Sequence, residues 1–368
     1  MQNQAVALNG RFLAAPATGV QRVAEELIKQ LDVLLDERPS GVRWTLFVPS
    51  NVKRHLALKN ITVRRGEGLG GPLWEQFELP RLARNQLLVS LCNQAPLLQK
   101  GGVLMIHDAQ AFISPESYSP LFRAWYRFSV PRMAASAERV LTVSNYSRDR
   151  LIEYGITTPS KTQVVYNGID HVSSIEADSG VIGKCALSPR GYVVALSNTQ
   201  KHKNISLLFE VFRQPDKRHL KLVLVGSAGK EEFERKDLQP PDNALFCGNV
   251  SDAALRALYE NALGLAFPST TEGFGLPPLE AMLSGCPAIV APRGALPEVC
   301  EDAALYADPD KPEAWSDAIN LLEQDPAARA ALVDKGRRRA AVFKWRESAR
   351  QLMAIIEQVL GEHIPAAD

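Results

Sequence analysis

The chain has 368 residues, and its 46% hydrophobic and 23% charged content is that of an ordinary globular protein, which excludes a fibrous repeat or a largely disordered chain. The length predicts two domains at roughly 100–200 residues each, and the net charge of +1 gives no reason to expect nucleic acid as a partner. No apolar run reaches the roughly 18 residues of a membrane-spanning helix. The N-terminal stretch lacks the basic residue that precedes the apolar run of a signal peptide, so we expect the protein in the cytoplasm.

Short apolar runs alternate with longer helix-like stretches, which predicts an α/β fold of parallel sheets with crossover helices. Ten such runs predict buried strands: 44–50, 86–91, 103–108, 139–144, 162–170, 191–197, 220–227, 243–249, 263–269 and 287–292. Most of them end in Gly, Ser, Asn, Asp or Pro, where a parallel strand leaves its sheet and a ligand crevice can open. Five cysteines at wide spacing, without a CxxC pair, predict buried thiols rather than disulfides or a zinc site.

The predicted domains follow from the break between the two sets of strands. They are an N-terminal domain 1–170, a polar, turn-rich linker 171–190, a C-terminal domain 191–344 and a C-terminal helix 345–368. Within that last stretch, Leu352, Ile355, Ile356 and Val359 share one face at helical spacing, so we expect it to pack on a domain surface.

The first half holds two weak signals and one stronger one. Segment 9–31 predicts a strand, a loop and a helix, with Thr18 and Gly19 just before the helix, where ordinary capping would explain them as well as a ligand. The glycines at 66, 68, 70 and 71 lack the G-x-G-x-x-G spacing and predict a flexible loop. His107 follows an apolar run and should lie at the carboxyl end of a strand, which favours a functional role.

The stretch 119–140 interleaves three arginines with aromatic residues. Such a helix can lie on an anionic membrane surface, or it can pack its aromatic face in the core with the arginines in water, which we favour. Residues 1–170 carry a net +6 and the remainder a net −5, so an anionic partner of the first half is also conceivable.

Two constellations in the second half indicate phosphate and sugar chemistry. After the strand 191–197 come Lys201, His202 and Lys203, just before a predicted helix; cations there are unfavourable with the helix dipole unless an anion such as a diphosphate lies between. In segment 267–287, a strand is followed by a glycine-containing loop at a helix start, which is a ready anion site. Glu272 and Glu280, with seven residues between them, would repel phosphate and are better suited to accept hydrogen bonds from sugar hydroxyls. Asp308-Pro309-Asp310 fits a metal–diphosphate motif, but we expect it to cap the following helix.

Together these segments resemble the family-four retaining glycosyltransferases. The matching pieces, in order, are TGVQR (18–22), LWEQFELP (73–80), IHD (106–108), VLTVSNYSRDRL (140–151), VVYNGID (164–170), KN (203–204), FCGNVSDAALRALYENA (246–262), PSTTEGFGLPPLEAM (268–282) and GALPEV (294–299). The ordered set covers nearly the whole chain and is highly specific. The resemblance implies the GT-B architecture of two facing Rossmann-like domains, with the acceptor bound by the N-terminal domain 1–170 and the nucleotide-sugar by the C-terminal domain 191–344. LWEQFELP with HDAQAF is most similar to a bacterial subgroup that includes O-antigen mannosyltransferases.

The resemblance also implies roles for individual residues. Glu280 would bind ribose, Glu272 would face the hydroxyls of the donor sugar, and Lys203 would hold the diphosphate. The other donor-binding positions would be Gly19, Lys201, Gly248, Asn249, Val250, Gly273, Phe274, Gly275 and Leu276, and His107 would lie beside the transferred sugar. Ser197 stands where many members carry an arginine, so the clamp would depend on Lys203, with help from Lys201 or His202.

The implied activity is metal-independent transfer of a hexose, best matched by mannose from GDP-mannose, with no cofactor. The acceptor would be a glycan or a polyprenyl-diphosphate-linked saccharide in bacterial surface polysaccharide synthesis, with peripheral contact at the inner membrane. Front-face attack with the departing phosphate as base would account for retention. Two alternatives remain: a non-catalytic GT-B subunit that binds a partner transferase, and a nucleotide-sugar epimerase, which the two spaced glutamates argue against.

Overall fold

The computed structural model describes residues 4–16, 18–38 and 41–362 and divides the chain into two compact α/β units. Unit 1 comprises residues 1–112, 120–168 and 344–368, and unit 2 comprises residues 113–119 and 169–343. In both units every paired strand runs parallel to its neighbour, as the alternation of apolar runs with helical stretches predicted.

Unit 1 is built on a seven-stranded sheet in the order β3-β2-β1-β4-β5-β6-β7. Its strands are β1 Ala5–Asn9, β2 Arg43–Val48, β3 Thr62–Arg65, β4 Leu87–Ser90, β5 Val103–Met105, β6 Arg139–Thr142 and β7 Thr162–Val164. Its helices are α1 Gly19–Glu37, α2 Gly71–Leu73, α3 Leu79–Leu82, α4 Gln110–Ile113, α5 Pro120–Ser136, α6 Asn145–Glu153 and α15 Trp345–Glu362.

Unit 2 is built on a six-stranded sheet in the order β10-β9-β8-β11-β12-β13. Its strands are β8 Tyr192–Leu196, β9 Lys221–Val225, β10 Ala244–Gly248, β11 Gly264–Phe267, β12 Ala288–Val290 and β13 Leu305–Tyr306. Its helices are α7 Gly180–Lys184, α8 Ile205–Arg213, α9 Lys230–Glu234, α10 Asp252–Asn261, α11 Leu276–Leu283, α12 Leu296–Cys300, α13 Pro312–Gln324 and α14 Pro326–Ala340.

All ten predicted strands are present, each one to six residues shorter than the apolar run that predicted it. The sequence placed a further strand at the start of segment 9–31, whereas β1 spans Ala5–Asn9 and a 3₁₀ turn, Arg11–Ala14, follows it. The predictions missed β3 and β13. The four side chains of β3 are all exposed, so no apolar run marks it; the carboxylate of Asp32 positions its start by accepting hydrogen bonds from the backbone N–H groups of Asn60 (2.7 Å) and Ile61 (2.8 Å). β13 has only two residues.

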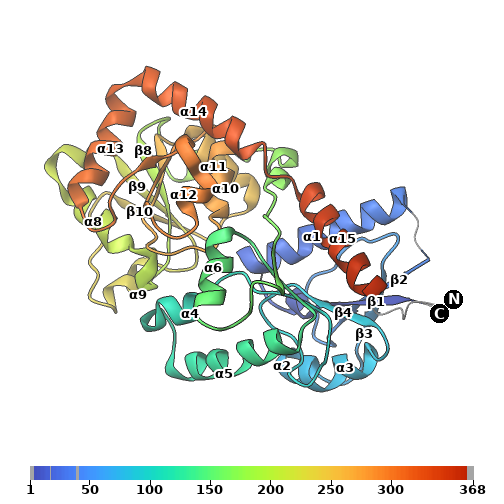
Figure 1. The fold of residues 1–368 in the computed structure, drawn as a ribbon. Helices are drawn as coiled ribbons and strands as arrows, with labels where there is room; N and C mark the ends of the chain where they lie inside the picture. Colours follow the sequence, from blue (N-terminus) through green and yellow to red (C-terminus); the bar gives the residue numbers. More distant parts are fainter. Residues whose placement is uncertain (1–3, 17, 39–40, 363–368) are drawn as a thin grey trace. The chain divides into compact units, whose positions relative to one another are not determined.

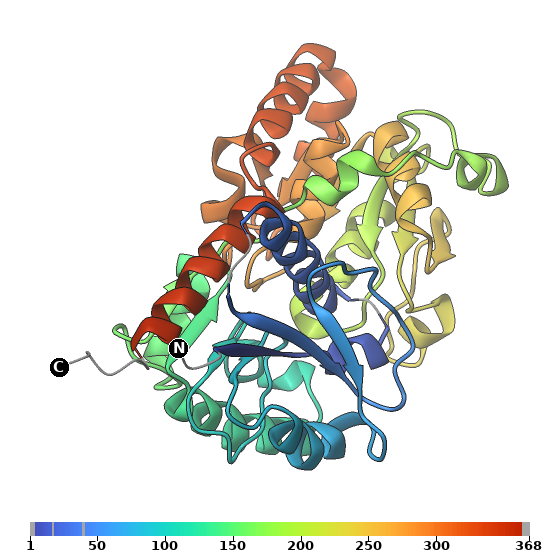
Figure 2. The same ribbon diagram turned by 90° about the vertical axis from the view of Figure 1, so that its right-hand side faces the viewer.

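The C-terminal helix belongs to unit 1, although residues 169–343 separate it in sequence from the rest of that unit. Both views show α15 lying beside α1 (Figures 1 and 2). Leu352, Ile356 and Val359 are fully buried, and Ile355 is half-buried, because the apolar face of α15 packs on unit 1. The predicted C-terminal helix 345–368 is described as far as Glu362, and residues 363–368 lie outside the described part of the chain, as do residues 1–3 of the N-terminal stretch.

The segment 171–190, expected to be an interdomain linker, forms part of unit 2 in the structure. It contains α7, which packs against α10, and Asp178 donates its backbone N–H to the carbonyl of Ala253 (3.0 Å). The chain passes from unit 1 to unit 2 at Gly168 and Ile169 instead.

The glycine-containing segment 66–71, expected to be a flexible loop, is tied to the helix that follows it. The carboxylate of Glu78 accepts hydrogen bonds from the backbone N–H groups of Glu67 (2.9 Å) and Leu69 (2.8 Å). A Cβ on Gly66 would come within 2.5 Å of both Glu78 and Trp74, so close packing rather than phosphate binding or mobility explains this glycine.

Candidate functional site

The predicted donor-site residues of unit 2 gather where the strand order of its sheet reverses. β8 and β11 are neighbours, and the chain proceeds from β8 through β9 to β10 on one side and from β11 through β12 to β13 on the other. Open α/β sheets bind ligands outside the carboxyl ends of the strands at this topological switch point. The loop after β8 carries Lys201 and Lys203, and the loop after β11 carries Glu272.

Lys203 and Glu272 form an ion pair at this switch point. Nζ of Lys203 lies 2.6 Å from Oε1 of Glu272, and the two side chains are 22% and 12% exposed. Lys203 ends a 3₁₀ turn, and Asn204 follows it in the left-handed conformation (φ 53°) before α8 begins. The Asn204 side-chain amide donates to the carbonyl of Pro309 (2.8 Å), which holds this change of direction in place. The two loops therefore bring together two residues that are far apart in sequence.

The backbone of Glu272 is held by a close approach at Gly294. A Cβ on Gly294 would lie 2.6 Å from the Glu272 nitrogen, and Gly294 has a φ of +64° that favours glycine. Its neighbour Ala295 donates its N–H to the Glu272 carbonyl (3.0 Å). The loop therefore presents the Glu272 carboxylate from a braced position.

The loop 273–276 leads into α11 in the way that the sequence predicted. Gly275 precedes the helix with a φ of +106°, and a Cβ there would meet Leu296 at 2.7 Å, so this position also needs glycine. Prolines follow in the first turn, where their missing N–H groups cost nothing. Gly275 and Leu276 lie where a helix leaves its N–H groups without intrahelical partners, which makes this loop suited to an anion. Gly273 and the buried Phe274 belong to the same loop.

Glu280 lies one turn into α11, beside a histidine that the sequence did not single out. Oε1 of Glu280 is 3.4 Å from Nε2 of His171. Both residues line a small cavity of unit 2 together with Tyr259, whose hydroxyl is buried and has no hydrogen-bond partner among the described residues. Burial raises the pKa of Tyr259, so its hydroxyl stays neutral. His171 lies on a 3₁₀ turn, Asp170–Ser174, in a polar stretch of the sequence without helical or strand periodicity, so no sequence signal separated it from its neighbours.

His202 cannot assist as a cation, contrary to one expectation for the phosphate clamp. It is buried, and burial, with Lys203 nearby, lowers its pKa to about 4, so it is neutral at pH 7. Its Nδ1 lies 2.9 Å from the hydroxyl of Ser117, also in unit 2. Lys201 is exposed on the same turn. Ser197 is buried, and its hydroxyl donates a hydrogen bond to the carbonyl of Ala228.

Gly248, Asn249 and Val250 lie at the edge of the same sheet. Gly248 ends β10, and Asn249 and Val250 follow it; β9 separates β10 from β8. Gly248 has a φ of +65°, and its carbonyl accepts a hydrogen bond from the N–H of Gly226 after β9 (2.9 Å). This loop is therefore at the carboxyl end of the sheet, two strands away from the ion pair.

Two predicted site residues, His107 and Gly19, lie in unit 1. His107 follows β5, is buried, and places Nε2 at 2.8 Å from the carbonyl of Leu91. Burial lowers its pKa to about 4, so it is neutral at pH 7; because a carbonyl only accepts, Nε2 carries the proton and Nδ1 keeps its lone pair. Gly19 is the first residue of α1, after Thr18, which forms a capping box with Gln21. Capping therefore accounts for Thr18.

The sequence predicted that the Asp308-Pro309-Asp310 motif caps the following helix. In the structure it does not, because Lys311 is the N-cap of α13. Instead Asp308 Oδ1 accepts from the N–H of Asp310 (3.1 Å). Nζ of Lys311 lies 3.7 Å from Asp308, and Arg293 lies 3.9 Å from Asp310.

Within the described ranges, no three His, Cys, Asp or Glu side chains are grouped so that they could hold a metal ion, and the five cysteines are free. No helix in the described ranges is long and apolar enough to cross a membrane.

Two family models match adjacent parts of the chain. Residues 17–172 match Glycosyltransferase Family 4, and residues 187–339 match Glycosyl transferases group 1. The boundary between the two matches falls close to the boundary between unit 1 and unit 2.

Curated relatives and solved structures agree with these models. The chain is 31% identical over 261 residues to O-antigen chain mannosyltransferase B of Escherichia coli, which covers 68% of each protein. It is 28% identical over 253 residues to O-antigen chain mannosyltransferase RfbU of Salmonella typhimurium, again 68% of each. The structure of HepE from Anabaena in complex with UDP-glucose aligns with 97% of this chain and 100% of that one, at a TM-score of 0.71 and 18% identity. The chain has two Rossmann-like units, each built on a parallel sheet. With these matches, it belongs to the family-4 glycosyltransferases with the GT-B fold.

Proposed function

We propose that this glycosyltransferase moves mannose from GDP-mannose, with retention of configuration, to a glycan or a polyprenyl-diphosphate-linked saccharide in surface polysaccharide synthesis. The observation that carries the proposal is the ion pair of Lys203 and Glu272 at the switch point of unit 2. It offers a cation for a diphosphate and a carboxylate for sugar hydroxyls within one small region. The names of the two O-antigen mannosyltransferases support mannose as the sugar, and the UDP-glucose in HepE supports a nucleotide-sugar as the donor class.

Each donor group has a counterpart among these residues. Lys203 and the backbone N–H groups of Gly275 and Leu276 would hold the diphosphate, since cations and helix N-termini both attract it. Glu272 would then turn from Lys203 to accept hydrogen bonds from hydroxyls of the mannose. Glu280 would accept from the ribose, and the loop 248–250 would contact the base.

In the proposed reaction, the bond between C1 of mannose and the β-phosphate oxygen breaks, and a bond from the acceptor oxygen to C1 forms on the same face. The acceptor proton passes to the departing phosphate oxygen, so GDP leaves carrying it. Positioning both substrates and stabilising the charge that develops on the diphosphate would supply most of the rate enhancement. His107 would contribute as a neutral group beside the sugar, because its pKa is lowered to about 4.

The proposal needs no divalent cation. The carboxylates of the one metal-like motif lie near cationic side chains, Lys311 by Asp308 and Arg293 by Asp310. Lys203 and the first turn of α11 would neutralise the diphosphate in place of a metal. A non-catalytic subunit and an epimerase, the alternatives left by the sequence, are not supported by relatives that are themselves transferases.

A binding screen tests the donor and the ribose contact together. In calorimetric titrations of GDP-mannose, UDP-glucose and ADP-glucose, GDP-mannose should bind most tightly. Glu280→Ala should weaken its binding about tenfold or more, because it removes hydrogen bonds to a charged acceptor worth roughly 1.5–3 kcal/mol. Glu210→Ala, an exposed glutamate on α8 of the same unit, should leave the affinity unchanged. Tighter binding of another nucleotide-sugar, or equal affinities for Glu280→Ala and wild type, would refute this donor assignment.

Chelation tests the absence of a metal requirement. Transfer from GDP-mannose should continue at an unchanged rate in excess EDTA, since Lys203 and backbone N–H groups take the place of a cation. Asp310→Asn should also leave turnover unchanged. Loss of transfer in EDTA, with recovery on addition of magnesium or manganese, would show instead that a metal bridges the diphosphate.

We further propose that α5 docks on an anionic membrane surface. The sequence favours a buried aromatic face for this stretch, but the structure exposes Leu121 (82%), Trp125 (40%) and Phe128 (47%) and buries Tyr126. Arg132 lies over the ring of Phe128 at 3.9 Å from its centroid. An exposed helix face with both aromatic rings and arginines suits an anionic bilayer, with each arginine worth about 1 kcal/mol near the surface.

Liposome flotation tests this docking. Wild-type protein should float with vesicles that contain anionic lipid at low salt and should be released at high salt. The Arg123/Arg127/Arg132→Gln variant should lose most of this binding. A matched Arg213/Arg218/Arg235→Gln variant removes the same charge from exposed positions in unit 2 and should float like wild type. If wild type ignores anionic vesicles at low salt, α5 is not a membrane-docking helix.

A further inference from the structure

Two of the five cysteines are in contact in unit 2. The Sγ atoms of Cys185 and Cys247 lie 3.5 Å apart, although the two residues are 62 positions apart in sequence. Both side chains are partly exposed, whereas Cys286 and Cys300 are buried. The sequence predicted buried thiols at all five positions, and the structure contradicts this for the pair. A small reagent in solution can therefore reach these two thiols.

Cys247 lies at a bulge of β10. Phe246 pairs with Leu224 and Gly248 with Val225, so Cys247 is the extra residue of the bulged strand. A bulge bends its strand and redirects a side chain. The bulge therefore sets where the thiol of Cys247 lies.

Cys185 is the C-cap of α7, and its backbone N–H donates to the carbonyl of Val181 (3.0 Å). The carbonyl of the next residue, Ala186, accepts a hydrogen bond from Nζ of Lys221 at the start of β9 (2.8 Å). This bond ties the end of α7 to the sheet. Regular structure therefore positions both thiols.

We propose that Cys185 and Cys247 form a reversible disulfide, which staples α7 to the sheet when the protein meets a low-molecular-weight disulfide such as oxidised glutathione. The S–S bond of a disulfide is about 2.0 Å long, so the two sulfurs need to approach by about 1.5 Å. Rotation about the Cα–Cβ bonds and a small shift of α7 can supply this approach. No residue of α7, which the structure describes in full, is buried, so little packing opposes the shift.

The exchange takes two steps, with Cys185 as the first nucleophile. Its thiolate attacks one sulfur of oxidised glutathione and breaks the S–S bond; one glutathione leaves and takes up the proton that Cys185 lost. The thiolate of Cys247 then attacks Sγ of Cys185, and the second glutathione leaves with the proton of Cys247. Two protein thiols are thereby oxidised to one disulfide, and one glutathione disulfide is reduced to two thiols.

The order of the steps follows from the surroundings of Cys247. Burial raises the pKa of its thiol to about 12, and the neighbouring Cys185 adds to the rise. Cys247 is therefore a poor first nucleophile, because the thiolate is the reactive form. Once Cys185 is part of a mixed disulfide, its contribution to this rise is gone. The pKa of Cys247 then falls, which favours the second step.

The disulfide would hold the segment through which the chain enters unit 2. Arg256 of α10 donates a hydrogen bond to the carbonyl of Val172 in this segment (3.1 Å). None of residues 173–185, all of them described, is buried. Segments with few buried contacts open more readily than the core. A covalent link from Cys185 to β10 should therefore suppress local opening of this segment.

Peptide mapping and thermal unfolding of the full chain test the proposal. The reduced protein is incubated with oxidised glutathione, and the remaining thiols are then blocked. Digestion without reductant should yield two peptides joined through Cys185 and Cys247. The Tm should rise by about 5 °C or more over that of the reduced protein, because the link closes a loop of about 60 residues. Trypsin should cleave the native oxidised protein after the exposed Lys184 more slowly, and dithiothreitol should reverse all three effects.

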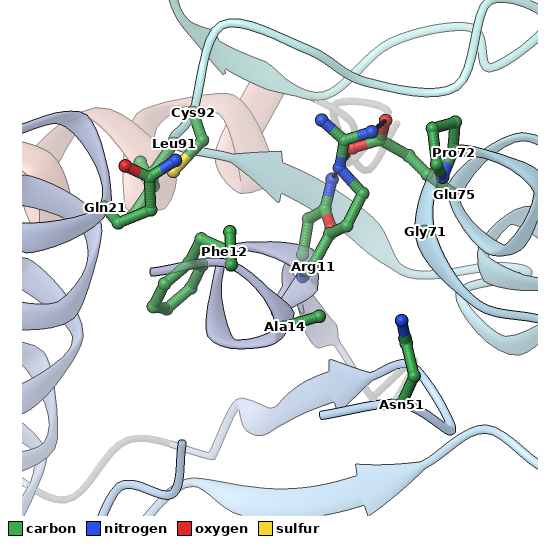
Figure 3. Close-up of a pocket in the computed structure, with 12 residues that line it drawn as sticks. Arg11, Phe12, Ala14, Gln21, Asn51, Gly71, Pro72, Glu75, Leu91 and Cys92 are labelled. Atoms are coloured by element: carbon green, nitrogen blue, oxygen red, sulfur yellow. Dashed lines mark hydrogen bonds and ion pairs between the residues drawn. The ribbon is translucent and has the colours of Figure 1, made fainter. Parts of the chain in front are cut away.

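Three serine variants provide the controls. Figure 3 shows Cys92 in the wall of a cavity of unit 1, where it is the one cysteine among the described lining residues. Cys92→Ser should therefore be linked and stabilised as wild type is. Cys185→Ser and Cys247→Ser should have the Tm of reduced wild type, and oxidised glutathione should give neither the linked peptides nor the rise in Tm.

Three results would overturn the proposal. One is the formation of mixed disulfides with glutathione, or no reaction at all, in place of the linked peptides in wild type. Another is a linked wild type whose Tm and cleavage after Lys184 equal those of the reduced protein. The third is an equal rise in Tm for Cys185→Ser or Cys247→Ser, since the effect would then not come from this disulfide.

Discussion

The parallel pairing of β8 with β11 is the constraint on which the candidate site depends. Gly264 pairs with Val193 and Leu265 with Val194, so the two strands end side by side although about 70 residues of chain separate them. Because parallel strands end at the same edge, the loops that follow must emerge together. Lys203 from one loop and Glu272 from the other then meet at 2.6 Å. A sheet with another strand order would leave these residues apart, whatever their spacing in the sequence.

The ion pair is suited to be exchanged for a ligand rather than to stabilise the fold. A largely buried pair of this kind adds little net stability, because the cost of removing both charges from water offsets their Coulombic attraction. What the pair does is hold both side chains in place before a donor arrives, which reduces the reorganisation that binding requires. The surrounding backbone is correspondingly rigid: Gly294, Ala295 and Asn204 each fix one part of the two loops.

The sequence predicted most of the fold because its strands are buried on both faces and therefore appear as continuous apolar runs. It also predicted that the segment 267–287 forms a loop around Gly275 followed by a helix, since glycine and proline have strong local conformational preferences. It did not predict β3, whose side chains are all exposed, or the placement of α15 in unit 1, because helical periodicity shows that a face is buried and not what covers it. The sequence also did not predict the exposure of the aromatic side chains of α5, because aromatic rings on a helix are usually buried. His171 and the pair of Cys185 and Cys247 are defined by contacts distant in sequence, which spacing alone does not reveal.

The most direct test of the donor site compares GDP and GDP-mannose in calorimetric titrations of wild type, Lys203→Met and Glu272→Gln. If Lys203 holds the diphosphate and Glu272 the sugar, Lys203→Met should weaken both ligands by about tenfold or more. Glu272→Gln should weaken GDP-mannose alone and leave GDP unchanged or bound more tightly, because Lys203 is released from its partner. If both variants bind GDP and GDP-mannose as wild type does, the ion pair at the switch point is not the donor site.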